Sequence, residues 1–153
     1  MPPRPRNAQT FVKQIPTALA DLEVELQTIV ASHGFCPSIH GVCVDSPHSE
    51  VRMERLNCPN LAEKYETDAD TPETIPEAVW DEIRRMVRIV YELEGIECID
   101  ITPYNFMQEG EGRVWMVDFG HAAYTTSKKG KPPANWFLRD FLEGNNCWNP
   151  DFR

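Results

Sequence analysis

The spacing of apolar residues predicts an amphipathic helix in the first third of the chain. Between residues 18 and 34, apolar side chains recur at steps of three or four positions, which is the period of a helix with one buried face. The residues of this stripe are Leu19, Leu22, Leu26, Ile29 and Val30. Gly34 follows them and is a typical helix stop, so we expect the helix to end there.

A second and longer helix is predicted in the middle of the chain. Its apolar stripe consists of Trp80, Ile83, Met86, Val87, Val90 and Leu93. Thr74, Pro76 and Glu77 have the spacing of a capping box with proline near the first turn, and Gly95 is placed to end the helix. We interpret this stripe as core packing.

Short β-prone runs predict strands and two hairpins. TFVKQI, residues 10–15, is one such run, and Pro16 ends it. SIHGVCV (38–44) and EVRMERL (50–56) flank the turn-rich DSPHS, which favours an antiparallel hairpin. NFM (105–107) and RVWMV (113–117) flank QEGEG, whose glycines allow the positive φ of a tight turn.

Two shorter helices complete the expected elements. NCPNLAEKY, residues 57–65, reads as a turn followed by a short helix, and the aromatic tail contains a helix from Trp136 to Leu142. The aromatic side chains of the tail are expected to close an edge of the core. The basic SKKGK, residues 127–131, reads as a flexible linker or as part of an activation segment.

Composition and charge limit the kinds of binding partner and the cellular compartment that we expect. The net charge of −9 argues against a broad nucleic-acid or anionic-membrane surface, and an acidic run spans residues 63–82. No apolar run approaches the ~20 residues needed to span a bilayer. The five cysteines are scattered, and we find neither a C-x-x-C motif nor a signal peptide. We therefore expect free thiols in a reducing, cytoplasmic compartment and no zinc site.

Three polar residues in the second half carry the candidate chemistry. CIDITPYN contains Asp100 and Asn105 five positions apart, and VDFG puts Asp118 directly after the second predicted hairpin. A hard cation such as Mg²⁺ prefers oxygen ligands, which Asn105 and Asp118 can supply. Asp100 could orient an acceptor hydroxyl and take its proton. The set therefore points to metal-bound phosphates.

This order of elements, with D-x-x-x-x-N and then D-F-G, resembles a protein kinase between about residues 10 and 124. The resemblance implies an α+β fold with two reduced lobes in one minimal domain. About 10–56 would form a small antiparallel sheet with one helix, and 57–153 a reduced helical lobe with the catalytic hairpin. It implies an ATP- and magnesium-dependent phosphotransferase acting on a Ser, Thr or Tyr hydroxyl, with a protein substrate or partner.

In the catalytic hairpin, the resemblance assigns three roles. Asp100 is the expected catalytic aspartate, while Asn105 and Asp118 are the expected metal ligands that also hold the nucleotide. Magnesium would neutralise charge on the transferring phosphoryl group.

In the first lobe, the resemblance makes Lys13 the lysine that contacts the nucleotide's α- and β-phosphates. Its expected ion-pair partner is Glu23, whose neighbours are apolar, with Glu25 in reserve. Met53 would flank the adenine, and Glu54 would begin the hinge.

The sequence also departs from the kinase pattern. Nine residues precede TFVK, too few for the expected Gly-rich hairpin, and the 33 residues after D-F-G contain no A-P-E. Cys98 and Ile99 stand where the family has His and Arg, so control by a phosphorylated activation segment is not expected. Thr102 replaces a lysine that would neutralise the phosphate.

Two functions therefore stay open from the sequence. One is a minimal kinase-like enzyme, and the alternative is a catalytically weak or inactive pseudokinase-like module that binds a protein partner. A small-molecule kinase is a lesser option within the enzyme class, because its second metal motif usually has another acid where this chain has Phe-Gly. The phosphate acceptor and the oligomeric state cannot be read from the residues.

Overall fold

A computed structural model describes residues 10–68 and 70–152. The expectation that the nine N-terminal residues cannot build a Gly-rich hairpin lies outside the described residues. The chain divides into two compact units, Met1–Asn57 (unit 1) and Cys58–Arg153 (unit 2). The described residues form small antiparallel sheets and four α-helices, in agreement with the predicted α+β class.

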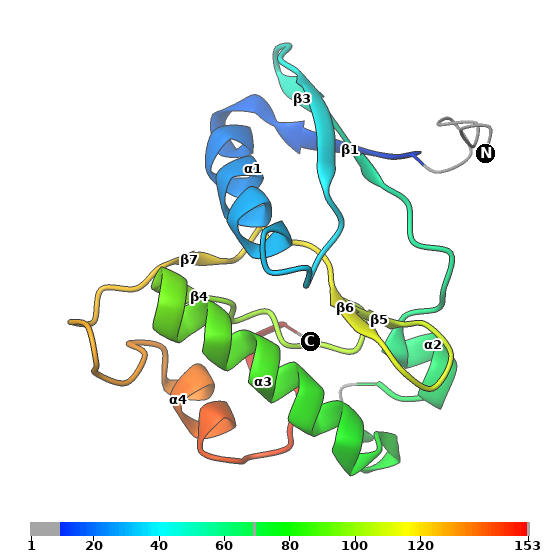
Figure 1. Ribbon diagram of the computed structural model, residues 1–153, viewed down its shortest axis with the longest axis vertical. Helices are drawn as coiled ribbons and strands as arrows, with labels where there is room; N and C mark the ends of the chain where they lie inside the picture. The colour runs from blue at the N-terminus through cyan, green and yellow to red at the C-terminus, as the bar shows by residue number, and fades with distance from the viewer. Residues whose placement is uncertain (1–9, 69, 153) are drawn as a thin grey trace. The chain divides into compact units, whose positions relative to one another are not determined.

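Unit 1 is a three-stranded antiparallel sheet with one helix. Its elements are β1 (Thr10–Pro16), α1 (Thr17–Ala31), β2 (Ile39–Cys43) and β3 (His48–Glu54). The strand order is β1-β3-β2, so the predicted hairpin forms and β1 adds to its outer side. α1 lies against this sheet (Figure 1), and one cluster of their shared core contains the buried residues Ile15, Ala20, Val51 and Met53.

The buried face of α1 differs from the predicted stripe. Leu26 and Val30 are fully buried, but Leu19 and Leu22 are 61% and 47% exposed, so the prediction was wrong for these two. Glu23 and Gln27 are buried instead. Gln27 can be buried because its Nε2 donates to the Pro37 carbonyl at 2.9 Å, and satisfied polar groups tolerate an apolar environment.

Unit 2 is built around the long helix α3. Its elements are α2 (Leu61–Tyr65), the 3₁₀ turn η2 (Pro72–Thr74), α3 (Glu77–Glu94), β4 (Ile96–Glu97), β5 (Phe106–Gln108), β6 (Val114–Met116), β7 (Ala123–Tyr124), α4 (Trp136–Leu142) and η3 (Pro150–Phe152). β5 and β6 form the second predicted hairpin, and β4 pairs with β7. The short helices α2 and α4 confirm the predictions for these segments.

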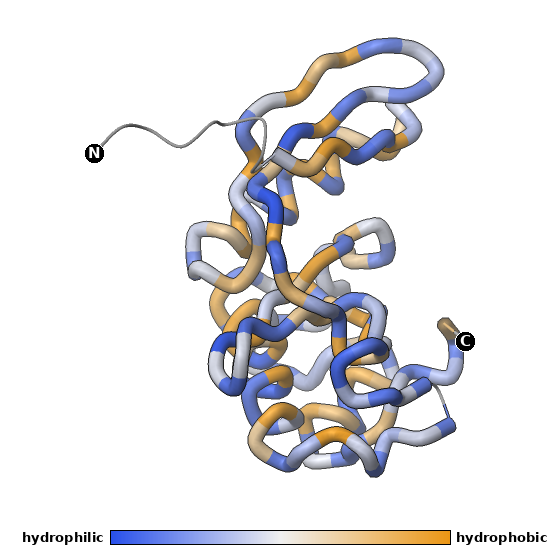
Figure 2. Tube along the Cα trace, turned by 90° about the vertical axis from the view of Figure 1, so that its right-hand side faces the viewer, coloured by the Kyte–Doolittle hydropathy of each residue, from blue (hydrophilic) through white to orange (hydrophobic). Residues whose placement is uncertain are grey.

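The core of unit 2 joins α3 to the C-terminal tail. Trp80 lies 4.4 Å from Trp148 and 6.0 Å from Phe141 between ring centroids, and all three are nearly inaccessible. α3 and α4 therefore pack side by side (Figure 1). The tail completes the core, as expected from its aromatic residues. In Figure 2, hydrophobic and hydrophilic residues alternate over short distances along the chain, as expected for elements that bury one face.

Two expectations for α3 need correction. The capping box does not form: Pro76 is the N-cap without a side-chain bond, and the Thr74 hydroxyl donates to the Thr71 carbonyl in the preceding 3₁₀ turn. Leu93 is 69% exposed because it borders a groove rather than another element. Gly95 ends the helix with a φ of 66°, as predicted.

None of the helices in the described part of the chain has the length and apolar character needed to cross a bilayer.

Candidate active site

The backbone of the β5–β6 hairpin brings Asp118 beside the loop that carries Asp100 and Asn105. The Asn105 N–H donates to the Thr102 carbonyl at 3.2 Å, which closes the loop. The Val117 N–H donates to the Asn105 carbonyl at 2.9 Å, at the base of the hairpin. Asn105 and the residue before Asp118 are thus joined by the main chain, although they are far apart in sequence.

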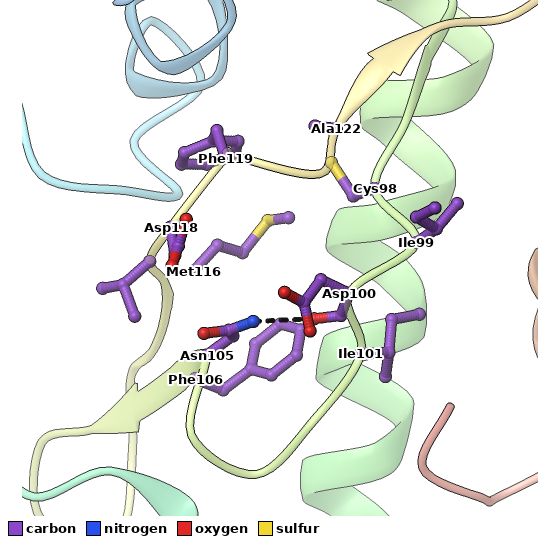
Figure 3. A pocket seen from close by; sticks show the side chains of 11 residues that line it. Cys98, Ile99, Asp100, Ile101, Asn105, Phe106, Met116, Asp118, Phe119 and Ala122 are labelled. Atoms are coloured by element: carbon purple, nitrogen blue, oxygen red, sulfur yellow. Dashed lines mark hydrogen bonds between the residues drawn. The ribbon is translucent and has the colours of Figure 1, made fainter. Parts of the chain in front are cut away.

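Asp100, Asn105 and Asp118 line one pocket (Figure 3). Its volume is about 20 Å³, enough for a water-sized occupant or an ion. The rest of the wall is largely apolar and includes Phe106, Met116 and Phe119. The structure therefore brings the three predicted residues of the second half together around an ion-sized space.

The Asn105 side chain is oriented by the loop itself. Its Nδ2 donates to the Asp100 carbonyl at 3.2 Å, the contact drawn dashed in Figure 3. Because the nitrogen is committed to this bond, the amide oxygen is the atom that can serve as a metal ligand. An amide oxygen beside a carboxylate is a donor set that suits Mg²⁺.

Asp118 adopts a backbone conformation that few residues with a side chain adopt. Its φ is 67°, in the left-handed region, and its Oδ1 accepts the Gly120 N–H at 2.9 Å. Aspartate tolerates this conformation because its short side chain can bond locally. Phe119 is buried next to it and anchors the turn, while Asp118 is exposed.

His121 is a residue of the site that sequence reasoning missed. Its Nδ1 lies 2.9 Å from Asp100 Oδ2, and its ring packs on Phe152 with centroids 4.8 Å apart. The Asp100 side chain is only 14% exposed, so this contact covers one side of its carboxylate. A histidine three positions after the D-F-G aspartate was a usable signal, whereas nothing local to Phe152 pointed to the site.

Cys98 contributes apolar volume to the pocket. Burial raises the pKa of the Cys98 thiol to about 12, so the side chain stays neutral at physiological pH. Thr102 is buried. Acidic side chains at the pocket are therefore those of Asp100 and Asp118.

The predicted residues of the first lobe belong to unit 1. Lys13 Nζ lies 2.6 Å from Glu23 Oε2, so the predicted pair forms, and the Glu23 side chain is only 8% exposed. Met53 is buried in the core of the unit, with Sδ 3.4 Å from Gln27 Nε2. Glu54 is the last residue of β3, and its N–H donates to the Ser38 carbonyl at 2.8 Å.

Their contacts with a nucleotide stay predictions. Among the described residues, no three His, Cys, Asp or Glu side chains gather as a metal site. A cation at the pocket would therefore need Asn105 as well as the carboxylates.

No protein-family model matches the chain, and no curated protein matches it.

Proposed function

We propose that the chain is an ATP- and magnesium-dependent phosphotransferase of the protein-kinase type, which acts on a Ser, Thr or Tyr hydroxyl of a protein. The observation that carries this proposal is the shared pocket of Asp100, Asn105 and Asp118. Two carboxylates and an amide in the order D-x-x-x-x-N and D-F-G are the groups this reaction needs. The Lys13–Glu23 pair in unit 1 adds the expected phosphate-contacting lysine.

Each residue has a distinct task in this reaction. Asp100 orients the acceptor hydroxyl and accepts its proton as the phosphoryl group transfers. The His121 contact holds one carboxylate oxygen of Asp100, which restricts its orientation. Lys13, kept extended by Glu23, contacts the nucleotide's α- and β-phosphates, with Met53 and Glu54 on the adenine side.

The residues present fit a magnesium ion, because the Asn105 amide oxygen and the Asp118 carboxylate are hard oxygen donors beside a space of about 20 Å³. These two residues would hold it. When bound, the ion neutralises negative charge on the phosphates during transfer.

A second candidate function has its own support. The pocket is far smaller than the roughly 300–1,000 Å³ of typical small-molecule sites, and His121 already occupies one side of Asp100. These observations favour a pseudokinase-like module that binds a protein partner and has little or no catalysis.

A thermal-shift series separates metal binding from catalysis. ATP with Mg²⁺ should raise the melting temperature of the wild type, because a ligand of the folded state stabilises it by mass action. Asp118→Ala should lose the Mg²⁺-dependent part of this shift, and Asp100→Asn should keep it. Asp140→Ala, which removes an exposed carboxylate of α4, is the matched control and should behave as wild type.

Transfer is then measured with radiolabelled ATP on a mixed-sequence peptide substrate. The enzyme proposal expects transfer by the wild type and loss in Asp100→Asn without loss of nucleotide binding. Nucleotide binding without transfer would select the second candidate function. Absence of any nucleotide effect on the wild type would remove the enzyme proposal.

A further inference from the structure

Unit 2 contains a second and much larger hollow away from the residues of the candidate active site. It has a volume of about 730 Å³ and lies along the C-terminal half of α3, the segment 125–133 and α4. We call it the basic groove. Its cationic lining residues are Arg88, Lys128, Lys129, Lys131 and Arg139. They are concentrated here although the chain as a whole carries a net charge of −9.

One buried carboxylate holds both ends of the lysine-rich segment. Glu97 Oε2 accepts the Thr125 hydroxyl at 2.5 Å and the Ala134 N–H at 2.8 Å. Glu97 Oε1 accepts the Asn135 N–H at 3.1 Å, and Glu97 is only 8% exposed. Bonds of main-chain and hydroxyl donors to a buried carboxylate are among the stronger hydrogen bonds in proteins. The segment is therefore a loop with fixed ends.

The middle of the same loop is also held. The Lys131 N–H donates to the Lys128 carbonyl at 3.0 Å, which closes a turn. The Tyr91 hydroxyl of α3 donates to the Lys131 carbonyl at 2.6 Å. The linker interpretation of SKKGK is thus replaced by a loop anchored at both ends and at its centre. Such pre-organisation reduces the entropy lost when a ligand binds.

Two cations of the groove are held by main-chain carbonyls. Arg88 Nη2 donates to the Leu142 carbonyl at 2.5 Å, and Arg139 Nη1 to the Ala134 carbonyl at 3.4 Å. A carbonyl orients a guanidinium but leaves its charge in place. Within the described part of the chain, none of the five cations of the groove forms an ion pair.

The other residues that line the groove favour a peptide ligand over a nucleic acid. Leu93, Pro132 and Leu142 provide apolar surface, which suits a ligand with both acidic and apolar side chains. Glu92 and Glu143 also line the groove, and with the acidic remainder of the chain they oppose a long polyanion. The volume lies within the range of about 300–1,000 Å³ that is typical of ligand sites.

We propose that the basic groove binds a short acidic peptide segment of a protein partner. The groove supplies electrostatic attraction from the lysines of the anchored loop and apolar contacts from Leu93, Pro132 and Leu142, so an acidic peptide with interspersed leucines fits best. This binding requires neither nucleotide nor Asp118, so it can be tested independently of the phosphotransferase function.

Fluorescence anisotropy tests this with a fluorescein-labelled peptide of Glu, Ser and Leu, in the absence of nucleotide. The control peptide has Lys in place of each Glu. The full chain should bind the acidic peptide and not the basic one, with affinity that falls as salt is added. The triple variant Lys128→Glu, Lys129→Glu, Lys131→Glu should bind at least about tenfold more weakly.

Matched single variants distinguish binding in the groove from attraction by the net charge of the protein. Lys129→Glu and Arg55→Glu make the same charge change, one in the groove and one at an exposed position of unit 1. Only Lys129→Glu should weaken binding appreciably. Equal losses in both variants would overturn the proposal. Circular dichroism melts confirm that each variant is folded.

Glu97→Gln gives an independent discriminator. It removes a negative charge, so attraction by net charge alone predicts equal or tighter binding of the acidic peptide. The anchored loop predicts weaker binding, because the carboxylate that holds both ends is lost. Unchanged or tighter binding, or tight competition by inorganic phosphate or single-stranded RNA, would overturn the acidic-peptide site.

Discussion

The two units of the chain solve the problem of burying a core in different ways. Unit 1 covers one face of a three-stranded sheet with one helix, and its buried side chains include Ile15, Leu26, Val30 and Val51. Unit 2 packs large aromatic side chains between α3, α4 and the tail, with Trp80, Trp148 and Phe141 almost fully buried. Among the described residues, six of the ten exposed large hydrophobic side chains lie in the smaller unit 1.

This difference indicates which unit can hold the side chains of a functional site in a fixed geometry. The pocket of Asp100, Asn105 and Asp118 and the basic groove are both in the unit with the larger core. A site is held most accurately when packed side chains and hydrogen bonds support it. In unit 1 the predicted functional feature is the ion pair between Lys13 of β1 and Glu23 of α1.

The largest expected effect tests the difference between the two cores. Trp80→Ala should lower the free energy of unfolding by about 3–5 kcal/mol, because it leaves a cavity beside Trp148 and Phe141. Leu22→Ala on the exposed side of α1 should cost less than about 1 kcal/mol. Urea denaturation followed by circular dichroism measures both, and similar losses would contradict the comparison.

The stability of the protein at alkaline pH should depend on Cys98, a buried thiol of unit 2. The folded pKa is raised from an ordinary 9.0 to about 12 by burial, so the folded state keeps the proton after the unfolded state has lost it. The contribution of the protonated Cys98 thiol to the free energy of unfolding is complete below pH 9.0. It is lost at roughly 1.4 kcal/mol per pH unit as pH rises toward 12.

Cys98→Ala should therefore show a shallower loss of stability with rising pH than the wild type. Urea denaturation across this pH range measures the slope. Cys43→Ala, at an exposed position of β2, controls for the removal of a thiol. Parallel curves for wild type and Cys98→Ala would show that the thiol is not sequestered.

A smaller effect is expected from the buried carboxylate of unit 2. Glu97→Gln should speed hydrogen exchange of the Ala134 and Asn135 amides by roughly tenfold to a hundredfold, corresponding to about 1–3 kcal/mol. Glu92→Gln, an exposed site on α3, is the control and should leave these amides unchanged. Protection that persists in Glu97→Gln would mean that the loop is held by other contacts.

The smallest effect is expected from the buried carboxylate of unit 1. Glu23→Gln should cost about 1–2 kcal/mol, because the half-buried Lys13 keeps a hydrogen-bond acceptor but loses the negative charge of Glu23 beside it. The control Glu25→Gln changes the same residue type at an exposed position of α1 and should cost less. Urea denaturation measures both variants, and a larger loss in Glu25→Gln would assign the main role to the reserve glutamate.

Local pattern was sufficient for most of the elements. Alternation, turn residues and glycine stops predicted both hairpins, α3 and α4, because these signals act within a few residues. The pattern failed where partners distant in sequence decide burial. Leu19 and Leu22 lie on the periodic stripe of α1, yet Glu23 and Gln27 are buried instead because they bond to Lys13 and Pro37.

By itself, the sequence determined the chemical identity of the candidate active site and its order along the chain: Asp100, Asn105 and Asp118 around a hairpin. Only the tertiary structure decided that these three line one pocket, that His121 contacts Asp100, and that Glu97 anchors the loop of the basic groove. The physical reason is that residue type and local spacing set what a side chain can do. Contacts between residues 21 or 37 positions apart depend on how the helices and hairpins pack.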